Sequence, residues 1–438
     1  MRSRAKSDAL FVRSSKVIPG GIYGHLSPSA SLPRHFAHFC SKGEGVHFED
    51  VDGNEWLDFM CAYGAVLHGY NHPEIEEAVA IQRKLGTVFN HPHEVSVELA
   101  EKLTDLIDFA DWAVFAKNGS DLTTWAIRVA REKTQRPIVI KARGAYHGVD
   151  AWCDPGMGGR IESDRADIKE FEWNNLNELE DLFKKFKDQV AAVILTPYHH
   201  ASFAPSVLPA ENFWVGVRKL CSENECILVL DDVRAGWRIH EKGSHCFFGF
   251  EPDLAVYSKA LGNGYAISAC VGIDSLKSAA SDVFLTGSCW NDAVAMRAAL
   301  TSISIDLTNW VKENKIGKSD EEFLNFIIDY FKTNDFFYNL TPIVNFKNNY
   351  SDFFFNSKEG YCEYYAGMFV ILSRLANIPS RIVSGYYGGI KNNYGNFYEF
   401  TQQDAHAWAE VWISDLGWVR FDPTSAIPLT RVKNNINQ

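Results

Sequence analysis

The sequence predicts an α/β domain with a mostly parallel sheet, followed by a smaller α+β domain. Over about the first 300 residues, short apolar runs alternate with segments of helical periodicity. Continuous runs rich in Val, Ile and Leu are typical of strands in a parallel sheet that helices cover on both faces. These runs occupy residues 113–117, 137–143, 191–197, 226–232, 254–260 and 267–273.

A change in composition predicts a domain boundary near residue 305. Asparagine accounts for 11 of the first 305 residues and for 16 of the remaining 133. Beyond the boundary, Ser319 and the acidic residues after it indicate the start of a helix. The alternating segments 405–413 and 417–423 indicate an antiparallel hairpin, joined by Ser414, Asp415 and Leu416. We therefore expect two domains, residues 1–305 and 306–438.

Charge and composition argue against several classes of partner. The formal net charge of −12 offers no electrostatic attraction to nucleic acid or to an anionic membrane. The chain has no run of about 18 apolar residues that could span a bilayer, and its start lacks the apolar core of a secretory signal. The nine cysteines show no paired spacing, which favours free thiols and no zinc site. We therefore expect a cytoplasmic protein.

Six ordered blocks in the first part of the chain carry a resemblance to a known family. They read HFEDVDGNEWLDFMCAYGAVLHGYNHPEIEEAV, KNGSDLTTWAIRVAR, RGAYHG, VLDDVRAGWR, VYSKALGNGY and TGSCWNDAVAMRAAL. Over residues 10–303 the chain resembles the class III aminotransferases, which use pyridoxal phosphate (PLP), and among them the glutamate-1-semialdehyde aminomutases. The resemblance implies the large domain of a fold type I PLP-dependent transferase and a substrate with an amino group, such as an amino acid.

This resemblance implies a role for several residues of the blocks. Lys259 would form the Schiff base with the cofactor, since burial lowers the pKa of an amine and leaves it nucleophilic. Asp231, at the end of a strand, would pair with the pyridine nitrogen. Gly119 and Ser120 precede a helix whose free N–H groups suit a phosphate. Asp121 adds a negative charge beside that phosphate.

Four further residues complete the expected cofactor site. Tyr146 would stack on the pyridine ring, with His147 beside it. Thr286 and Ser288 resemble the segment that reaches the phosphate across a dimer interface in this family, so we expect a homodimer formed through the first domain. The C-terminal small domain of the family has no counterpart after about residue 303, and its loss would leave the site open to water.

The last third of the chain presents a different set of chemical groups. Cys362 opens a stretch of helical periodicity, and His406 and Asp422 lie on the two segments of the expected hairpin. In a cysteine nucleophile the thiolate attacks a carbonyl, the imidazole relays the proton and the carboxylate orients the ring. The positive end of a helix dipole favours the thiolate form of a cysteine. These residues therefore predict a second active site.

The blocks around these three residues carry a second resemblance. They read GYCEYYA, IPSRIVSGYYGG, DAHAWAEVW and GWVRFDPT. Over residues 306–432 the chain resembles bacterial members of the transglutaminase-like superfamily, which have an α+β, papain-like fold. The resemblance implies Cys362 as nucleophile, His406 as base and Asp422 as orienting acid, with a glutamine-type protein or peptide substrate. It leaves open whether the acyl group passes to an amine or to water.

The sequence allows three functions. In the first, both domains are catalytic: a PLP-dependent aminotransferase or aminomutase is fused to a Cys-His-Asp acyltransferase or peptidase. In the second, only the cysteine domain is catalytic, and the first domain is a degenerate scaffold. In the third, the chain is a non-catalytic module that binds peptides. The residues also leave open whether the fusion is natural or engineered.

Overall fold

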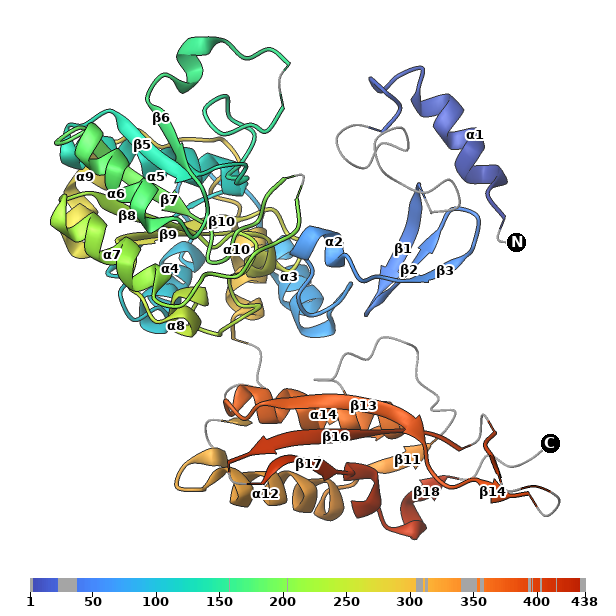
Figure 1. Ribbon diagram of the computed structural model, residues 1–438. Helices are drawn as coiled ribbons and strands as arrows, with labels where there is room; N and C mark the ends of the chain where they lie inside the picture. The colour runs from blue at the N-terminus through green and yellow to red at the C-terminus, as the bar shows by residue number, and fades with distance from the viewer. Residues whose placement is uncertain are drawn as a thin grey trace. The chain divides into compact units, whose positions relative to one another are not determined.

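The computed structural model of the chain divides into two compact units, Met1–Ile303 and Ser304–Gln438 (Figure 1). The structure describes residues 3–22, 38–156, 158–202, 204–304, 310–311, 314–339, 353–354, 358–392, 395, 397–401, 404–414 and 416–433.

The first unit is built on a seven-stranded sheet of order β4-β10-β9-β8-β7-β5-β6. Strand β10 is antiparallel to both of its neighbours, and the other neighbouring pairs are parallel. The expected mostly parallel sheet is therefore confirmed. The strands are β4 (Trp112–Ala116), β5 (Ile138–Ala142), β6 (Ile168–Phe171), β7 (Val190–Leu195), β8 (Ile227–Asp231), β9 (Leu254–Tyr257) and β10 (Ser268–Gly272).

Helices cover both faces of this sheet, as Figure 1 shows. On one face, α5 (Gly119–Thr134) and α9 (Lys277–Asp282) bury their apolar residues against the sheet. The other face packs against four helices: α4 (Val95–Leu106), α6 (Leu176–Lys185), α7 (Phe213–Glu223) and α10 (Ala293–Ser302). Because both faces are covered, strands such as β7 and β9 are buried along their whole length.

The amino-terminal part of this unit adds a small antiparallel sheet and three helices. The sheet contains β1 (Cys40–Glu44), β2 (His47–Asp50) and β3 (Glu55–Leu57) in that order. The helices are α1 (Ala5–Ser14), α2 (Cys61–Gly64) and α3 (Pro73–Leu85). Helix α3 packs against α10, and the side-chain amide of Asn263 hydrogen-bonds the backbone of residues 67–69. These contacts hold the segment after α2 near the loop that follows β9.

The second unit packs a buried helix against small sheets. Helix α14 (Cys362–Leu375) lies on the antiparallel sheet of β13 (Ser380–Tyr386), β16 (Ala405–Ile413) and β17 (Gly417–Phe421). Strand β11 (Phe337–Asn339) pairs in parallel with β12 (Glu359–Gly360) and β18 (Val432–Lys433), and β14 (Ile390–Lys391) pairs with β15 (Tyr398–Glu399). Aromatic residues from α12 (Asp320–Thr333) and α14 fill the core.

Local signals in the second unit agree with the elements that form. Ser319 caps α12, since its Oγ accepts from Glu322 N at 3.2 Å and the Glu322 carboxylate accepts from Ser319 N at 2.7 Å. The expected hairpin is confirmed by the antiparallel pairing of β16 with β17, in which Ala409 lies opposite Phe421. Asp415, expected in its turn, lies outside the described residues.

The described residues contain neither a helix that could span a membrane nor a cluster of metal-binding side chains. None of their helices combines the length and the hydropathy that crossing a bilayer requires. No group of three or more His, Cys, Asp or Glu side chains in the described ranges could hold a metal ion.

Candidate active sites

The carboxyl ends of four strands meet at one edge of the large sheet. Strands β4 and β9 are both antiparallel to β10 and therefore run the same way, and β8 and β5 run parallel with β9. The residues that follow these four strands are expected to share one edge, which is where ligands bind in open α/β sheets. Lys259 lies two residues beyond the end of β9, which stops at Tyr257 and not at residue 260 as expected.

Asp231 is a buried acidic residue at this edge of the sheet, and hydrogen bonds hold its carboxylate in place. It is the last residue of β8, and its Oδ2 lies 2.8 Å from Nδ1 of His147, in a pair that is almost fully buried. Its Oδ1 accepts from Val233 N at 3.2 Å, and Thr123 Oγ1 donates to the carbonyl of His147 at 2.7 Å. Nε2 of His147 is buried and has no hydrogen-bond partner among the described residues. The structure thus brings the predicted residues 147 and 231 together.

Lys259 opens a short 3-10 helix with a φ of 47°, in the left-handed region that non-glycine residues seldom adopt. Burial lowers the pKa of its amine, and the positive charge of Arg234 lowers it further, while Asp231 raises it. Lysine amines with a lowered pKa are more often neutral, which is the nucleophilic form. Asp231 ends β8 and Lys259 follows β9, the neighbouring parallel strand, so both lie at the same edge of the sheet.

Gly119 and Ser120 form a narrow helix start. A Cβ on Gly119 would lie 2.8 Å from Cγ2 of Val233, so only glycine allows this approach of α5 to the loop after β8. Ser120 Oγ accepts from Val149 N at 3.2 Å, which ties it to the loop that carries His147. The carboxylate of Asp121 accepts from the backbone N–H of Asn118 at 2.8 Å, so this residue caps the helix.

Three further predicted residues make no described side-chain hydrogen bond to this cluster. Tyr146 is 37% exposed, and burial of the rest of the side chain raises its pKa. Thr286 and Ser288 are exposed on the loop between α9 and α10. That loop ends at Asp292, whose Oδ2 lies 2.8 Å from Nζ of Lys117. The loop is therefore anchored next to the helix start, although its two hydroxyls reach no described partner there.

In the second unit, Cys362 is the first residue of α14 and is 7% exposed. It packs against Ala407 of β16 and against the partly buried Tyr338 and Tyr361. Burial raises the pKa of Tyr338 to about 12, and the neighbouring Cys362 adds to the shift. The thiol therefore sits at a helix N-terminus, against a strand and a tyrosine.

His406 and Asp422 form a close pair at the end of the hairpin. Nε2 of His406 lies 2.7 Å from Oδ2 of Asp422, and both side chains are largely buried. Asp422 follows β17, and its Oδ1 accepts from the backbone and the hydroxyl of Thr424 at 3.2 and 2.6 Å. The residue after His406 on β16 is Ala407, which belongs to the same small cluster as Cys362. Adjacent residues of a strand point to opposite faces, so the structure pairs His406 with Asp422, and no hydrogen bond among the described residues joins either of them to Cys362.

The model of the family described as aminotransferase class-III matches residues 29–322, well over half of the chain. The chain belongs to the class III aminotransferase family. In addition, the model of the transglutaminase-like superfamily matches residues 309–423 of this class III chain. Both predicted resemblances are confirmed at this level.

Known relatives support the same assignment of the class III chain. It is 41% identical over 305 residues to the aminopentol aminotransferase of Sphingopyxis macrogoltabida, covering 70% of this chain and 72% of that protein. It is 31% identical over 331 residues to glutamate-1-semialdehyde 2,1-aminomutase 1 of Lachnoclostridium phytofermentans, covering 72% of this chain and 77% of the relative. A PLP-containing form of the FumI protein of Sphingopyxis sp. MTA144 superposes with a TM-score of 0.67 at 38% identity, covering 71% and 78% of the two chains.

The structure brings further residues to this sheet edge that the sequence analysis did not assign to the candidate site. Val233 packs on Gly119, and Arg234 contacts His200. Asp232 is buried and accepts from Ser244 N at 2.9 Å, and burial raises the pKa of its carboxyl to about 6. The block VLDDVRAGWR already contains three of these residues, and their position directly after a strand end was the available signal.

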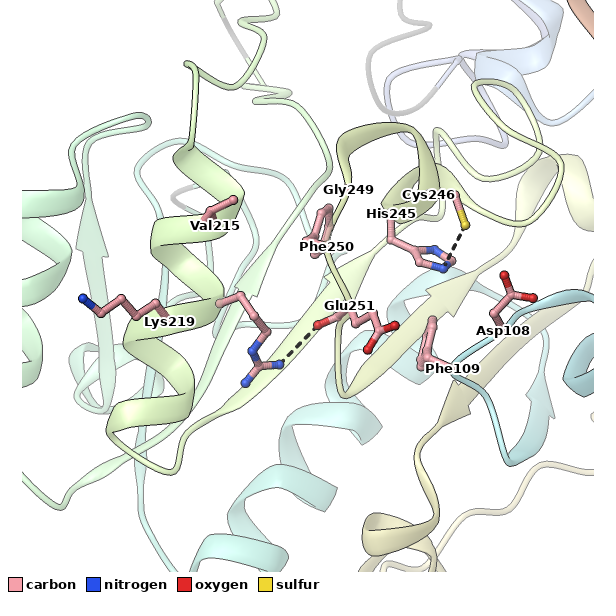
Figure 2. A pocket seen from close by; sticks show the side chains of 10 residues that line it. Asp108, Phe109, Val215, Lys219, His245, Cys246, Gly249, Phe250 and Glu251 are labelled. Atoms are coloured by element: carbon pink, nitrogen blue, oxygen red, sulfur yellow. Dashed lines mark hydrogen bonds between the residues drawn. The ribbon is translucent and has the colours of Figure 1, made fainter. Parts of the chain in front are cut away.

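A hollow in the first unit lies away from this chemistry. Figure 2 shows side chains from the segment before β4, from α7 and from α8 (Ser244–Phe248), among them Asp108, His245 and Cys246. Asp108 precedes β4 and Glu251 precedes β9, so the hollow adjoins the amino ends of these strands. None of the predicted cofactor residues lines it, and we place the candidate site at the opposite, carboxyl edge.

Proposed function

We propose that residues 1–305 bind PLP at Lys259 and transfer amino groups. The observation that carries this proposal is the meeting of Lys259, the Asp231–His147 pair and the Gly119 helix start at one sheet edge. Family membership and the PLP-containing relative support it. When bound, PLP supplies an electron sink for the pair released when a proton leaves the carbon that bears the amino group.

The described residues fit such a cofactor. A glycine-lined helix start with free backbone N–H groups suits a phosphate dianion, and Asp121 caps the helix through the N–H of Asn118, so the first helical N–H groups stay available. The buried carboxylate of Asp231 suits a protonated ring nitrogen. Lys259, with its lowered pKa, suits covalent attachment to an aldehyde.

Each residue then has a distinct task. Lys259 would hold the cofactor covalently and move a proton at the substrate carbon next to nitrogen. Asp231, oriented by His147, would keep the pyridine nitrogen protonated. Tyr146 would stack on the ring.

We further propose that the first domain forms a homodimer. In that dimer Thr286 and Ser288 of one protomer would reach the phosphate bound by its partner. The substrate would be an amino acid or another compound with an amino group, as the names of the relatives indicate for those proteins.

The decisive experiment asks whether Lys259 carries the cofactor. PLP added to the full chain should give a visible absorbance band, and borohydride reduction should leave a pyridoxyl adduct on the peptide that contains Lys259. Lys259→Ala should abolish both signals. Lys277→Ala, at an exposed position of α9, is the matched control and should leave both unchanged. A wild-type chain without band or adduct would mean that the first domain is only a scaffold.

We propose a second function for residues 306–438, in which Cys362, His406 and Asp422 catalyse acyl transfer or hydrolysis. The 2.7 Å pair of His406 with Asp422, on the sheet against which the helix of Cys362 packs, carries this proposal. Since Nε2 of His406 faces Asp422, Nδ1 is the ring nitrogen left for the thiol. The match of the transglutaminase-like family model to residues 309–423 supports this second proposal.

The reaction would proceed in two balanced steps. The thiolate of Cys362 attacks the carbonyl carbon of a glutamine-type side chain or a peptide, so that a C–S bond forms and the C–N bond breaks. The leaving nitrogen takes the proton from the imidazolium of His406. An amine or water then attacks the thioester, gives its proton to His406 and releases the thiolate. Asp422 fixes the ring throughout.

Alkylation tests this second site without a known substrate. At neutral pH, iodoacetamide should modify Cys362 faster than the exposed Cys289, although Cys362 is buried. His406→Ala should remove this advantage, whereas Cys289 should react as before. Faster labelling of Cys289 in the wild-type chain would contradict an activated thiol and would favour a peptide-binding module.

A further inference from the structure

A second hollow of the first unit lies along β6, the outermost strand on one side of the large sheet. Its volume is about 470 Å³, and its walls come from β6, from the carboxyl-terminal half of α6 and from the segments before β6 and after β5. Four cationic side chains line it against one acidic side chain, Glu170, although the chain as a whole has a net charge of −12. The cations are Arg143, Arg165, Lys169 and Lys185.

The acid and one of these cations are already paired. The carboxylate of Glu170 lies 2.7 Å from Nζ of the buried Lys141 and 3.8 Å from Nη1 of Arg143. Arg143 also forms ion pairs with Glu172 and Glu178. The acids at this end of the hollow therefore compensate Lys141 and Arg143.

The other three cations have no acidic partner in the described part of the chain. No carboxylate oxygen there lies within 4.0 Å of the charged groups of Arg165, Lys169 or Lys185. Arg165 ends the short 3-10 helix before β6 (Glu162–Arg165). Its guanidinium donates through Nε to the carbonyl of Ala151 at 3.2 Å and through Nη2 to the carbonyl of Asp154. These carbonyls hold the guanidinium in place without neutralising its charge, and they use only two of its five N–H donors.

The two lysines are held next to one aromatic ring. Nζ of Lys169 lies 5.2 Å from the ring centroid of Phe186, and Nζ of Lys185 lies 5.3 Å from the same centroid. Attraction between an ammonium group and the face of a ring keeps the cation in place and leaves its charge unchanged. Nζ of Lys169 also donates to the carbonyl of Ala166.

The neighbouring lysine of α6 differs from Lys185 in its partners. Lys184 lies 2.9 Å from the carboxylate of Glu180 and 3.7 Å from that of Asp181. Both lysines belong to the last turn of α6, where a cation offsets the negative end of the helix dipole. That effect does not account for Arg165, which comes from a different element.

We propose that this hollow binds a small organic phosphate. Unpaired cations around one hollow repel each other, and an anion between them removes the repulsion. An arginine with donors to spare and two compact ammonium groups suit a phosphoryl group, which takes several donors at once. Ile168, Leu182 and Phe186 line the same hollow and offer apolar surface to the organic part of the ligand.

This site is distinct from the proposed cofactor site and does not depend on it. Gly119, at the helix start assigned to the phosphate of PLP, follows β4. Strands β4 and β6 are the two outermost strands of the seven-stranded sheet, on opposite sides. A loss of ligand binding in variants of the hollow therefore reports on the hollow and not on the helix start.

The test measures binding of phenyl phosphate to the full chain by isothermal titration calorimetry. The chain is first reduced with borohydride in the presence of one equivalent of PLP, and mass spectrometry checks that the adduct lies on Lys259, so that the proposed cofactor site is filled. The variants are Arg165→Gln and Lys185→Gln. Lys184→Gln is the matched control, because it removes the same charge from the same helical turn, at a lysine that is already paired. Equal circular dichroism spectra show that each variant is folded.

The expected losses differ between the two variants. Arg165→Gln should weaken phenyl phosphate binding by on the order of 10- to 100-fold, the effect of one hydrogen bond to a charged group. Lys185→Gln should weaken it by about 2- to 5-fold, because the lysine is exposed. Lys184→Gln should leave binding almost unchanged. Inorganic phosphate should bind more weakly than phenyl phosphate, since it has no apolar group to pack on Phe186.

Three results would overturn the inference. They are a wild-type chain that does not bind phenyl phosphate, losses in Arg165→Gln and Lys185→Gln no larger than that in Lys184→Gln, and inorganic phosphate that binds as tightly as the ester. Should Arg165→Gln fail to fold, the double variant Lys169→Gln/Lys185→Gln takes its place and should weaken binding more than Lys185→Gln alone. A chain that takes up no PLP but binds phenyl phosphate through these residues would refute the proposed aminotransferase function and keep this site.

Discussion

Replacing Gly119 with alanine should disturb the helix start that we assign to the phosphate. The added Cβ would lie 2.8 Å from Cγ2 and 2.9 Å from Cγ1 of Val233. Carbon atoms pack best at about 3.5–4.0 Å, so the first turn of α5 or the loop after β8 must move by about 0.7 Å. Overpacking of this kind costs about 1–3 kcal/mol. The higher helix propensity of alanine offsets less than about 1 kcal/mol of this.

The same displacement should weaken cofactor binding. Loss of one aligned N–H donor to a charged phosphate costs about 1.5–3 kcal/mol, which corresponds to a Kd for PLP raised on the order of 10- to 100-fold. Spectroscopic titration with PLP measures the Kd. Hydrogen exchange of the α5 peptide, followed by mass spectrometry, measures local stability in the first unit alone.

A double-mutant cycle isolates the contact with Val233. Val233→Ala in the Gly119→Ala background should recover stability, with a coupling energy of about 1–3 kcal/mol. Gly158→Ala is the matched control, because a Cβ there would meet nothing within 4 Å. A Gly119→Ala chain that is more protected from exchange than the wild type, with an unchanged Kd, would refute the steric argument.

Three further predictions concern stability. Phe369 is fully buried and stacks on Phe421, so Phe369→Ala should cost about 3–5 kcal/mol in urea unfolding of the second unit, and an effect below 1 kcal/mol would contradict its place in the core. Ser319→Ala should cost about 1 kcal/mol through loss of the α12 cap, and an unchanged unfolding midpoint would argue against that cap. Burial lowers the pKa of His72 to about 4, so the unfolded chain binds more protons than the folded one between about pH 6.5 and 4. Stability of the first unit should therefore fall as pH falls through this window, by up to about 3 kcal/mol from this group, and His72→Leu should show a shallower fall in urea unfolding.

The strands and helices near the two sites followed from local patterns. Apolar runs fixed the positions of β7, β8 and β10 to within a residue or two, because a strand covered on both faces must be apolar throughout. The apolar run at 254–260 predicts a strand that extends three residues beyond the observed end of β9 at Tyr257. Ser258 and Lys259 continue the sequence pattern of the strand, but the chain leaves the sheet after Tyr257. Lys259 then adopts a left-handed backbone conformation that no local sequence pattern predicts.

The sequence by itself determined the two families, the two sets of chemical groups and the order of the elements that carry them, since these depend on residue types and spacing along the chain. Only the tertiary structure decided which groups touch. The pairs of Asp231 with His147, Arg234 with His200 and His406 with Asp422 each join residues from separate elements. Such contacts depend on sheet order and on the packing of loops at strand ends, which are properties of the folded chain and not of any local segment.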